Sequence, residues 1–299
     1  MRNKADANAA QPGNPSALAA TVYQVAFAGH SVAIRLSTDA AHTFLAFLFA
    51  DLHSPAAPET TPLLELTAQD THYLLTDQSR TLYSGRLDVQ FAAVLFDQVI
   101  YHLLHTQHNG VALHAGAVSW QGQTILLPGR SGSGKSSVTA WLTSQGCSYL
   151  SDELVFLPND GAGVVIPFPR PFCLKPGSAA VVKALLPAAQ QVGLLADEHG
   201  AVIPHRLFNP TCTLASTPPG VLLFPVYQSG AVLHVEQLSQ ARASALLMSC
   251  DVNARNLPDH GFHQITQLAR SIPAWQITYS SFAGLPEVWS DLAASFTSP

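Results

Sequence analysis

The sequence predicts an α/β fold with α+β elements, in which a small N-terminal region precedes a larger α/β domain. Two observations support this fold class. Residues 129–136, GRSGSGKS, match the phosphate-binding pattern GxxxxGK[ST] and lie between an apolar strand and an amphipathic helix, as a P-loop requires. Residues 22–105 combine two long helical patterns with several β-rich runs, so a mixed region comes before the motif.

Composition limits the classes of protein to which the chain can belong. Of its 299 residues, 47% are hydrophobic and 11% are charged, which is enough apolar material for a full-sized core. The net charge of −5 and the lack of a basic run argue against binding to nucleic acid or to an anionic membrane surface. The longest apolar stretches, such as 44–50, are too short to span a bilayer.

The termini and the cysteines suggest where the protein works. Residues 1–20 are rich in Ala, Asn, Pro and Gly, and we predict a disordered tail rather than a signal peptide. The four cysteines form no CxxC pair, which favours free thiols in a reducing compartment. These features predict a soluble, cytoplasmic protein.

Residues 21–108 are predicted to form the N-terminal α+β region. A hairpin is expected over 22–37, where two β-rich runs flank a glycine. Apolar residues at helical spacing predict a helix over 40–52, and strands with turns follow over 60–84. The strongest helical pattern covers 87–105, because its apolar pairs recur every four residues and mark one buried face.

Residues 109–299 are predicted to form the P-loop domain. Its first elements are two strands, the glycine-rich motif, a helix over 135–145 that Gly146 closes, and a strand over 148–157. Short strands and loops are expected over 158–236. The remaining elements are two helices, a strand and a final helix, expected at 239–248, 262–271, 275–279 and from Pro286 onward.

Each fixed position of the glycine-rich motif has a physical task. Its glycines allow turns that a Cβ would prevent and direct backbone N–H groups at one anion, and the helix N-terminus adds positive charge. Lys135 is expected at the β- and γ-phosphates, and the Ser136 hydroxyl at Mg²⁺. The alternative is a glycine-rich turn without a ligand. The predicted ATP-binding residues are Gly129, Arg130, Ser131, Gly132, Ser133, Gly134, Lys135, Ser136 and Ser137.

Two consecutive acids follow the motif. Asp152 and Glu153 lie in the predicted strand 148–157, and a strand next to the P-loop strand would bring them to the γ-phosphate. Phosphoryl transfer uses one carboxylate to hold the metal and another to accept the proton of the acceptor hydroxyl. We assign the metal to Ser136 and Asp152 and the proton to Glu153, although the two acids could exchange roles. The alternative is a solvated strand end or a salt-bridged pair.

The segment 113–157, LHAGAVSWQGQTILLPGRSGSGKSSVTAWLTSQGCSYLSDELVFL, resembles the HPr kinase/phosphorylases. That family has a histidine-glycine strand, a turn, the P-loop, a helix and a paired acidic motif. His114 matches its active-site histidine in spacing, Glu153 matches its proton-accepting aspartate, and Asp152 matches the acidic neighbour. The resemblance implies the HPr kinase/PEP-carboxykinase-like fold, with ATP and Mg²⁺ as cofactors.

Further segments resemble a subgroup of HPr-kinase-related kinases often associated with peptide-modification gene clusters. They are PFPRPFCLK, PHRLFNP, LLFPVYQSGA and SCDVNARNLPDHGF, at 167–175, 204–210, 222–231 and 249–262. Two departures limit the transfer from true HPr kinases. A glutamate replaces the second aspartate of the acidic pair, and no counterpart of the family's downstream metal-binding glutamate is evident, so the reverse phosphorolysis does not carry over.

Three cationic positions have weaker support. Arg170 and Lys175 flank a proline-rich turn and could stabilise phosphate charge during transfer, or they could be ordinary surface cations. His205, followed by Arg206, could line the acceptor site.

The sequence therefore predicts an ATP- and Mg²⁺-dependent kinase. Its expected acceptor is a serine or threonine hydroxyl of a peptide or small protein. The alternatives are a metabolite kinase and a nucleotide-sensing module without transfer chemistry. The low charge content suggests either a homo-oligomer or an apolar groove for a peptide, and the oligomeric state of HPr kinases favours the homo-oligomer. The predicted catalytic residues are His114, Lys135, Asp152, Glu153 and Arg170.

Overall fold

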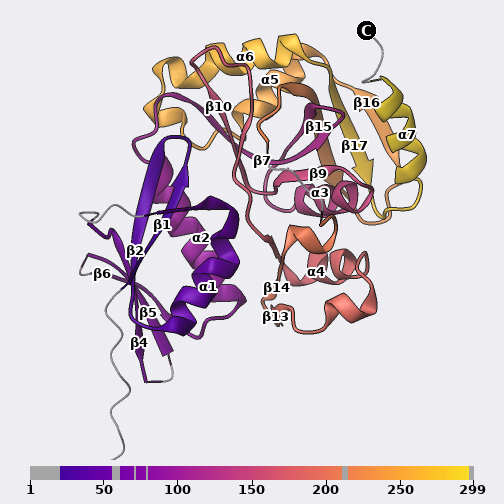
Figure 1. The fold of residues 1–299 in the computed structure, drawn as a ribbon. Helices are drawn as coiled ribbons and strands as arrows, with labels where there is room; N and C mark the ends of the chain where they lie inside the picture. The colour runs from indigo at the N-terminus through magenta and orange to yellow at the C-terminus, as the bar shows by residue number, and fades with distance from the viewer. Residues whose placement is uncertain (1–20, 56–60, 71, 79, 211–214, 296–299) are drawn as a thin grey trace, which may run out of the picture.

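The computed structural model has a mixed α/β fold, shown in Figure 1. The strands of the described residues form a six-stranded, an eight-stranded and a three-stranded sheet. The predicted tail at 1–20 and Cys212 lie outside the described part of the chain. The structure describes residues 21–55, 61–70, 72–78, 80–210 and 215–295.

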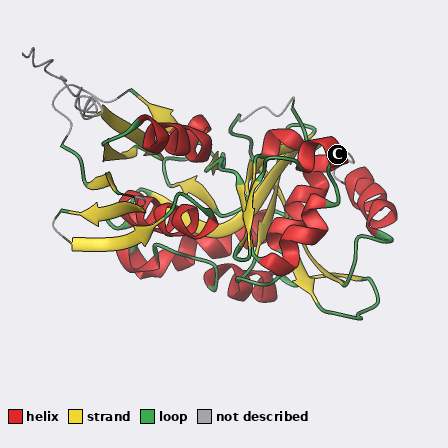
Figure 2. Ribbon diagram, turned by 90° about the horizontal axis from the view of Figure 1, so that it is seen from below, coloured by secondary structure: helices red, strands yellow, loops and turns green. Residues whose placement is uncertain are grey.

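Helices lie against the sheets throughout the described part of the chain, as Figure 2 shows. No helix in these residues is long and apolar enough to cross a bilayer. The α-helices are α1 (Asp39–Phe49), α2 (Val89–Leu104), α3 (Lys135–Ser144), α4 (Pro176–Lys183), α5 (Gln240–Met248), α6 (Phe262–Ser271) and α7 (Leu285–Ser295). The strands are β1 (Thr21–Phe27), β2 (His30–Leu36), β3 (His53–Ser54), β4 (Leu64–Gln69), β5 (His72–Asp77), β6 (Arg80–Gly85), β7 (Gly110–Trp120), β8 (Gln123–Pro128), β9 (Ser148–Ser151), β10 (Leu154–Pro158), β11 (Ile166–Pro167), β12 (Phe172–Leu174), β13 (Leu195–Asp197), β14 (Gly200–Ile203), β15 (Pro219–Tyr227), β16 (His234–Gln237) and β17 (Ala274–Tyr279).

The six-stranded sheet, in the order β3-β1-β2-β4-β5-β6, packs against α1 and α2. Alternate residues of β1 and β2 are buried, and α2 buries the apolar face that its four-residue repeat predicts. Side-chain caps fix both helix starts, since Thr38 accepts the N–H of Ala41 and Asp88 accepts the N–H of Phe91. The predicted hairpin and both helices are confirmed within a few residues.

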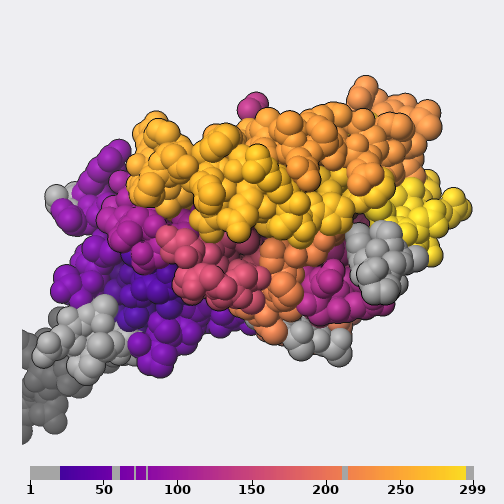
Figure 3. Space-filling model, turned by 90° about the horizontal axis from the view of Figure 1, so that it is seen from above, coloured from indigo at the N-terminus to yellow at the C-terminus, as the bar shows by residue number. Residues whose placement is uncertain are grey.

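The eight-stranded sheet, in the order β11-β10-β7-β8-β15-β17-β16 with β9 also on β7, is covered on both faces. Helices α5 and α6 pack on one face, and α3 and α7 on the other. Figure 3 shows that residues of the C-terminal third, in orange and yellow, form much of the face seen from above. Strands β8, β15 and β17 run parallel, so their carboxyl ends meet at one edge.

The first core cluster joins the two predicted regions of the chain. Besides β1, β2, α1 and α2, it contains Leu154, Phe156 and Phe168 from the second region. The Phe27 ring lies edge-on to Phe168, with 5.1 Å between centroids, and edge-on to Phe156 at 6.3 Å. The N-terminal region therefore packs directly on the segment that carries the acidic pair.

Strand β7 changes its neighbours on both edges near its midpoint. On one edge it pairs with β8 from Ala115 onward, while His114 donates its N–H to the Cys250 carbonyl at 2.7 Å. On the other edge it pairs with β10 up to His114 and with β9 from Ala117. His114 thus lies where β8 ends and the glycine-rich loop begins.

The prediction of one strand over 148–157 is wrong, because a bend at Asp152 and Glu153 separates β9 from β10. The Ser151 hydroxyl accepts the N–H groups of Glu153 and Leu154, at 3.2 and 3.1 Å, and replaces part of the ladder. The acidic pair was also expected on a strand next to β8, the strand that leads into the glycine-rich loop. In the structure β7 lies between the bend and β8.

Asn253 fixes the start of β7 from the opposite end of the chain. Its buried amide donates to the Gln107 and Gly110 carbonyls, both at 3.0 Å, and accepts the Ala112 N–H at 2.8 Å.

We expect Asn253→Ala to lower the free energy of unfolding by about 2–4 kcal/mol, because buried backbone groups lose their partners. Urea denaturation measures this loss. The exposed Asn159, changed to Ala as a control, should leave stability unchanged; an equal effect of both changes would contradict the anchoring role.

Candidate functional site

A cavity of about 510 Å³ opens at the carboxyl end of β8, directly above the N-terminus of α3. Its lining comes from the glycine-rich loop (residues 129–134), the middle of β7, the acidic bend, the start of α4 and the ends of β15 and β17. The residues predicted from the sequence to carry chemistry line this cavity or lie directly behind its lining. His205 and Arg206 are the exceptions.

The loop conformation depends on its glycines for two different reasons. Gly132 and Gly134 have φ values of 87° and 90°, which L side chains rarely adopt. At Gly129 the reason is close approach, because a Cβ there would lie 2.4 Å from the Ser133 hydroxyl. A Cβ on Gly134 would also lie 2.1 Å from the Tyr279 hydroxyl, so the loop is pressed against β17.

Lys135 begins α3 and is only 6% exposed. The helix lies close to β7 because the facing residue is Gly116, where a Cβ would meet the Thr139 hydroxyl at 2.3 Å. The sequence alone did not indicate that Gly116 allows this close approach of α3 to β7, although the residue lies in the conspicuous segment 113–157. The positive charge of Lys135 lowers the pKa of both acids of the bend, so the three groups share one site.

The acidic bend holds a buried ion-pair cluster. Arg170, 3% exposed, places Nη2 at 3.2 Å from Asp152 Oδ1 and at 2.7 Å from Glu153 Oε2. Asp152 is fully buried, and burial raises the pKa of its carboxyl although Arg170 and Lys135 oppose the shift. The prediction that Arg170 could be an ordinary surface cation is thereby wrong.

Glu153 differs from its neighbour because it faces the cavity. His114 Nε2 lies 3.0 Å from Glu153 Oε1, so the carboxylate accepts from both His114 and Arg170. Burial alone would raise the pKa of Glu153. The hydrogen bond from His114 and the charges of Arg170 and Lys135 outweigh it and hold the pKa well below its usual range. Glu153 is therefore ionised at neutral pH.

Arg170 is held by groups from three parts of the chain. Its Nη1 donates to the Pro171 carbonyl at 3.2 Å, and its own carbonyl accepts the Tyr149 hydroxyl at 2.7 Å. Its guanidinium carbon lies 4.5 Å from the centre of the Phe96 ring, a cation–π contact from α2. Phe96 brings the N-terminal region to the ion-pair cluster. The four-residue apolar repeat of 87–105 predicted only a core position for Phe96.

Lys175 and His205 have different surroundings. Lys175 Nζ donates to the Ser131 hydroxyl at 2.9 Å and lines the cavity, so this exposed lysine contacts the glycine-rich loop. The His205 ring is buried and stacks on Tyr149 with 4.4 Å between centroids. Burial lowers its pKa to about 4. Arg206 pairs with Asp51 of the N-terminal region. The expectation that His205 and Arg206 line an acceptor site finds no support in these positions.

The surroundings of Asp152 suit a divalent cation. Neither carboxylate oxygen has a hydrogen-bond partner of normal geometry among the described residues, although both are buried. The Ser136 hydroxyl lies close enough to lower the Asp152 pKa. The described residues contain no cluster of three or more His, Cys, Asp or Glu side chains that could hold a metal. A hydroxyl with one carboxylate suits Mg²⁺, which takes its other ligands from phosphates and water.

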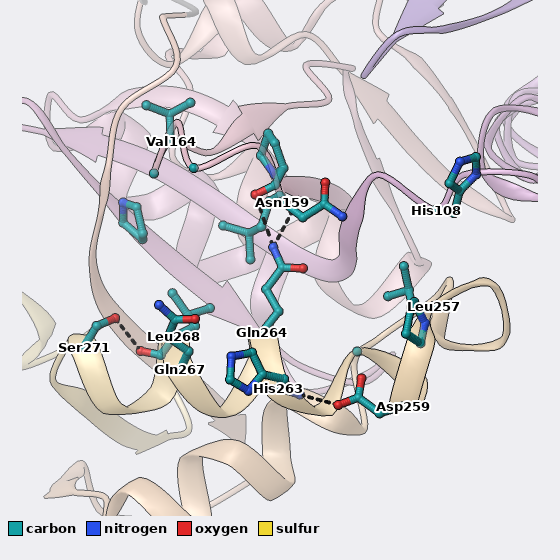
Figure 4. A pocket seen from close by; sticks show the side chains of 17 residues that line it. His108, Asn159, Val164, Leu257, Asp259, His263, Gln264, Gln267, Leu268 and Ser271 are labelled. Carbon is teal, nitrogen blue, oxygen red and sulfur yellow. Dashed lines mark hydrogen bonds between the residues drawn. The ribbon is translucent and has the colours of Figure 1, made fainter.

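A second cavity of about 550 Å³ lies between the end of β10 and α6. Figure 4 marks the hydrogen bonds made there by Gln264, Asp259 and Ser271. Gln264 donates to the Leu157 carbonyl at 2.9 Å, and Asp259 accepts the His263 N–H of the first turn of α6 at 3.2 Å. The ion-pair cluster and the glycine-rich loop are absent from its lining, so the first cavity is the candidate site.

Comparison with known proteins gives little similarity. No protein-family model matches the chain, and no curated protein matches it. Among solved structures, the HPr(Ser) kinase/phosphatase of Coxiella burnetii is similar at 11% identity and a TM-score of 0.31, over 62% of this chain and 94% of that one. A match of this quality assigns neither a family nor an activity, so the functional assignment rests on the site itself.

Replacing Arg170 tests the ion-pair cluster. We expect Arg170→Met to lower the free energy of unfolding at pH 7 by about 3–5 kcal/mol, because the buried Asp152 carboxylate and the partly exposed Glu153 carboxylate lose their cation. The folded pKa of Glu153 lies below its unfolded value, so its stabilisation is present above about pH 4.3 and is lost as the pH falls further. The difference between variant and wild type should therefore shrink at about pH 4.

Urea denaturation at both pH values measures this difference. The control is Arg242→Met, because Arg242 pairs with Glu236 on the surface and its side chain is 49% exposed. That change should cost less than about 1 kcal/mol at either pH. A deficit for Arg170→Met that does not change with pH would contradict the role of the carboxylates.

Proposed function

We propose that the protein is an ATP- and Mg²⁺-dependent phosphotransferase that acts on a hydroxyl acceptor. The observation that carries this proposal is the convergence of Lys135, His114 and Glu153 on one cavity at a glycine-rich loop, with Asp152 and Arg170 directly behind it. A turn that binds no ligand would not need a buried lysine, a buried aspartate and a buried arginine at its mouth.

The loop would bind the triphosphate. Its backbone N–H groups and the N-terminus of α3 offer a positive site for phosphate oxygens, and Lys135 neutralises charge beside it. Lys175 already contacts the loop through Ser131 and would move the short distance from that hydroxyl to a phosphate oxygen. Ser136 and Asp152 would hold Mg²⁺, which shields phosphate charge when bound.

Glu153 would accept the hydrogen bond of the acceptor hydroxyl. Its low pKa makes it a weak base, but phosphoryl transfer passes through a loose transition state in which the hydroxyl gains little charge. Orientation then matters more than basicity, and His114 with Arg170 fixes the carboxylate. The proton moves from the hydroxyl to Glu153 as the oxygen–phosphorus bond forms and the bond to ADP breaks.

The acceptor we propose is a serine or threonine of a peptide or small protein. This choice rests on the sequence resemblance to the HPr-kinase-related kinases. A metabolite hydroxyl is the alternative within the same chemistry, and a nucleotide sensor is the alternative without transfer. The ion pairs on Glu153 would suit a sensor only if no acceptor hydroxyl can displace His114 or Arg170 from it.

Labelling with γ-labelled ATP and Mg²⁺ against peptides encoded near the gene tests the proposal. Wild type should label a serine or threonine, and Lys135→Ala should abolish labelling because the phosphates lose their buried cation. Glu153→Gln should lower turnover by about 10²- to 10⁴-fold and still bind ATP. Lys183→Ala, on the far end of α4, is the control that should keep activity.

The outcomes separate the alternatives. ATP binding without labelling of any peptide moves the assignment to a metabolite kinase or to a sensor, and ATP turnover with added metabolites distinguishes those two. Near-normal turnover by Glu153→Gln removes the proton acceptor from the proposal. Failure of wild type to bind ATP refutes it.

The metal assignment has its own test. We expect Ser136→Ala to raise the Mg²⁺ concentration required for half-maximal activity by about ten-fold, because the cation loses one protein ligand. Saturating Mg²⁺ should restore much of the activity. Ser144→Ala, at the far end of α3 and outside the cavity lining, is the control, and an equal Mg²⁺ requirement in both variants would remove Ser136 from the metal site.

A further inference from the structure

The cavity has two chemically different ends, separated by the strand that carries the glycine-rich loop. In the sheet, β8 lies between β7 and β15. The β7 end holds the His114–Glu153 pair, with the buried Asp152 and Arg170 behind it. The opposite end, at the carboxyl ends of β15 and β17, is lined by Tyr227, Tyr279 and Phe282.

The aromatic end is built against the loop itself. Tyr227 donates its backbone N–H to the Ser133 carbonyl at 2.8 Å, and the Tyr279 hydroxyl donates to the Gly134 carbonyl at 3.0 Å. Both tyrosines are therefore fixed relative to the loop residues that lead into α3. A Cβ on Gly134 would lie 3.1 Å from the Cβ of Tyr227, which confirms how closely this wall approaches the loop.

The rings support one another. Tyr227 meets Tyr279 edge-on, with 5.7 Å between centroids, and Phe282 lies nearly parallel to Tyr279 at 6.4 Å. Phe282 in turn packs on Trp141 of α3. Tyr279 is largely buried and its hydroxyl is occupied, whereas Tyr227 remains 50% exposed on the cavity side. Tyr227 thus offers a rigidly supported aromatic surface next to a charged phosphate site.

We propose that Tyr227 is the stacking surface for the nucleobase of the bound nucleotide, with Tyr279 and Phe282 holding it in place. This inference rests on the proposed function. If the γ-phosphate lies at the acids on the β7 end, the rest of the nucleotide crosses the loop toward β15 and β17, where a flat apolar ring can cover the exposed tyrosine. Stacking depends little on which base is present, so ATP and GTP should both bind.

Two ligands that differ only by the nucleoside test this assignment. Binding of Mg²⁺–ATP and of Mg²⁺–tripolyphosphate is measured by calorimetry on the full chain. Tyr227→Ala should weaken ATP binding about ten-fold and leave tripolyphosphate binding unchanged. Tyr227→Phe should restore ATP binding, because it keeps the ring. Tyr101→Ala, which removes a tyrosine that is 59% exposed on α2 outside the cavity, should bind both ligands as wild type does.

Other outcomes overturn the inference in distinguishable ways. Equal ATP affinity of wild type and Tyr227→Ala shows that the base does not stack there. Equal weakening of ATP and tripolyphosphate shows that Tyr227 only shapes the loop. If wild type binds tripolyphosphate as tightly as ATP, the proposed phosphate site is supported and the proposed base site is refuted. Wild type that binds neither ligand refutes the proposed function together with this inference.

Discussion

The buried ion pairs of Arg170 are the interaction on which the rest of the site depends. A guanidinium that is 3% exposed is stable only with carboxylates beside it, and two consecutive acids supply them at 3.2 and 2.7 Å. The pairs tie the acidic bend to the segment before β12, and Phe96 adds α2 of the N-terminal region. A cluster of this kind is costly to bury, so its position at the mouth of a glycine-rich loop favours a functional reason over a purely structural one.

The register of β7 places the chemistry relative to that cluster. His114 is the last residue of β7 paired with β10, and the next residue begins the pairing with β8. The glycine-rich loop leaves β8 at this point, and the acidic bend interrupts β9 and β10 opposite it. A slip of one residue along β7 would turn His114 to the other face of the sheet and remove it from Glu153. Asn253 and the carbonyl of Cys250 fix the register on the edge that β8 leaves free.

Local sequence patterns predicted the elements well and their neighbours poorly. The motif at 129–136 predicted a strand, a glycine-dependent loop and a helix, and in the structure Gly132 and Gly134 of that loop have positive φ. The break at Asp152 was missed, because the short apolar runs on either side of it were interpreted as one strand, whereas the Ser151 hydroxyl accepts two backbone N–H groups at the bend. Burial of Arg170 and His205 was not predictable either, since it depends on aromatic rings that are distant in sequence.

The division of the cavity suggests how binding and chemistry are shared. Charged groups gather at the β7 end, where in the proposed transfer an ionised Glu153 and Lys135 would face developing charge and an error of position would cost most in rate. The aromatic end near Tyr227 offers dispersion and apolar contact without charge, and so can hold a ligand without disturbing the ion pairs. In the proposed transfer, binding energy gained at the aromatic end would be available to fix the reacting group at the charged end. Because β8 and its loop separate the two ends, a change at one can alter ligand affinity while the geometry of Glu153 and His114 stays intact.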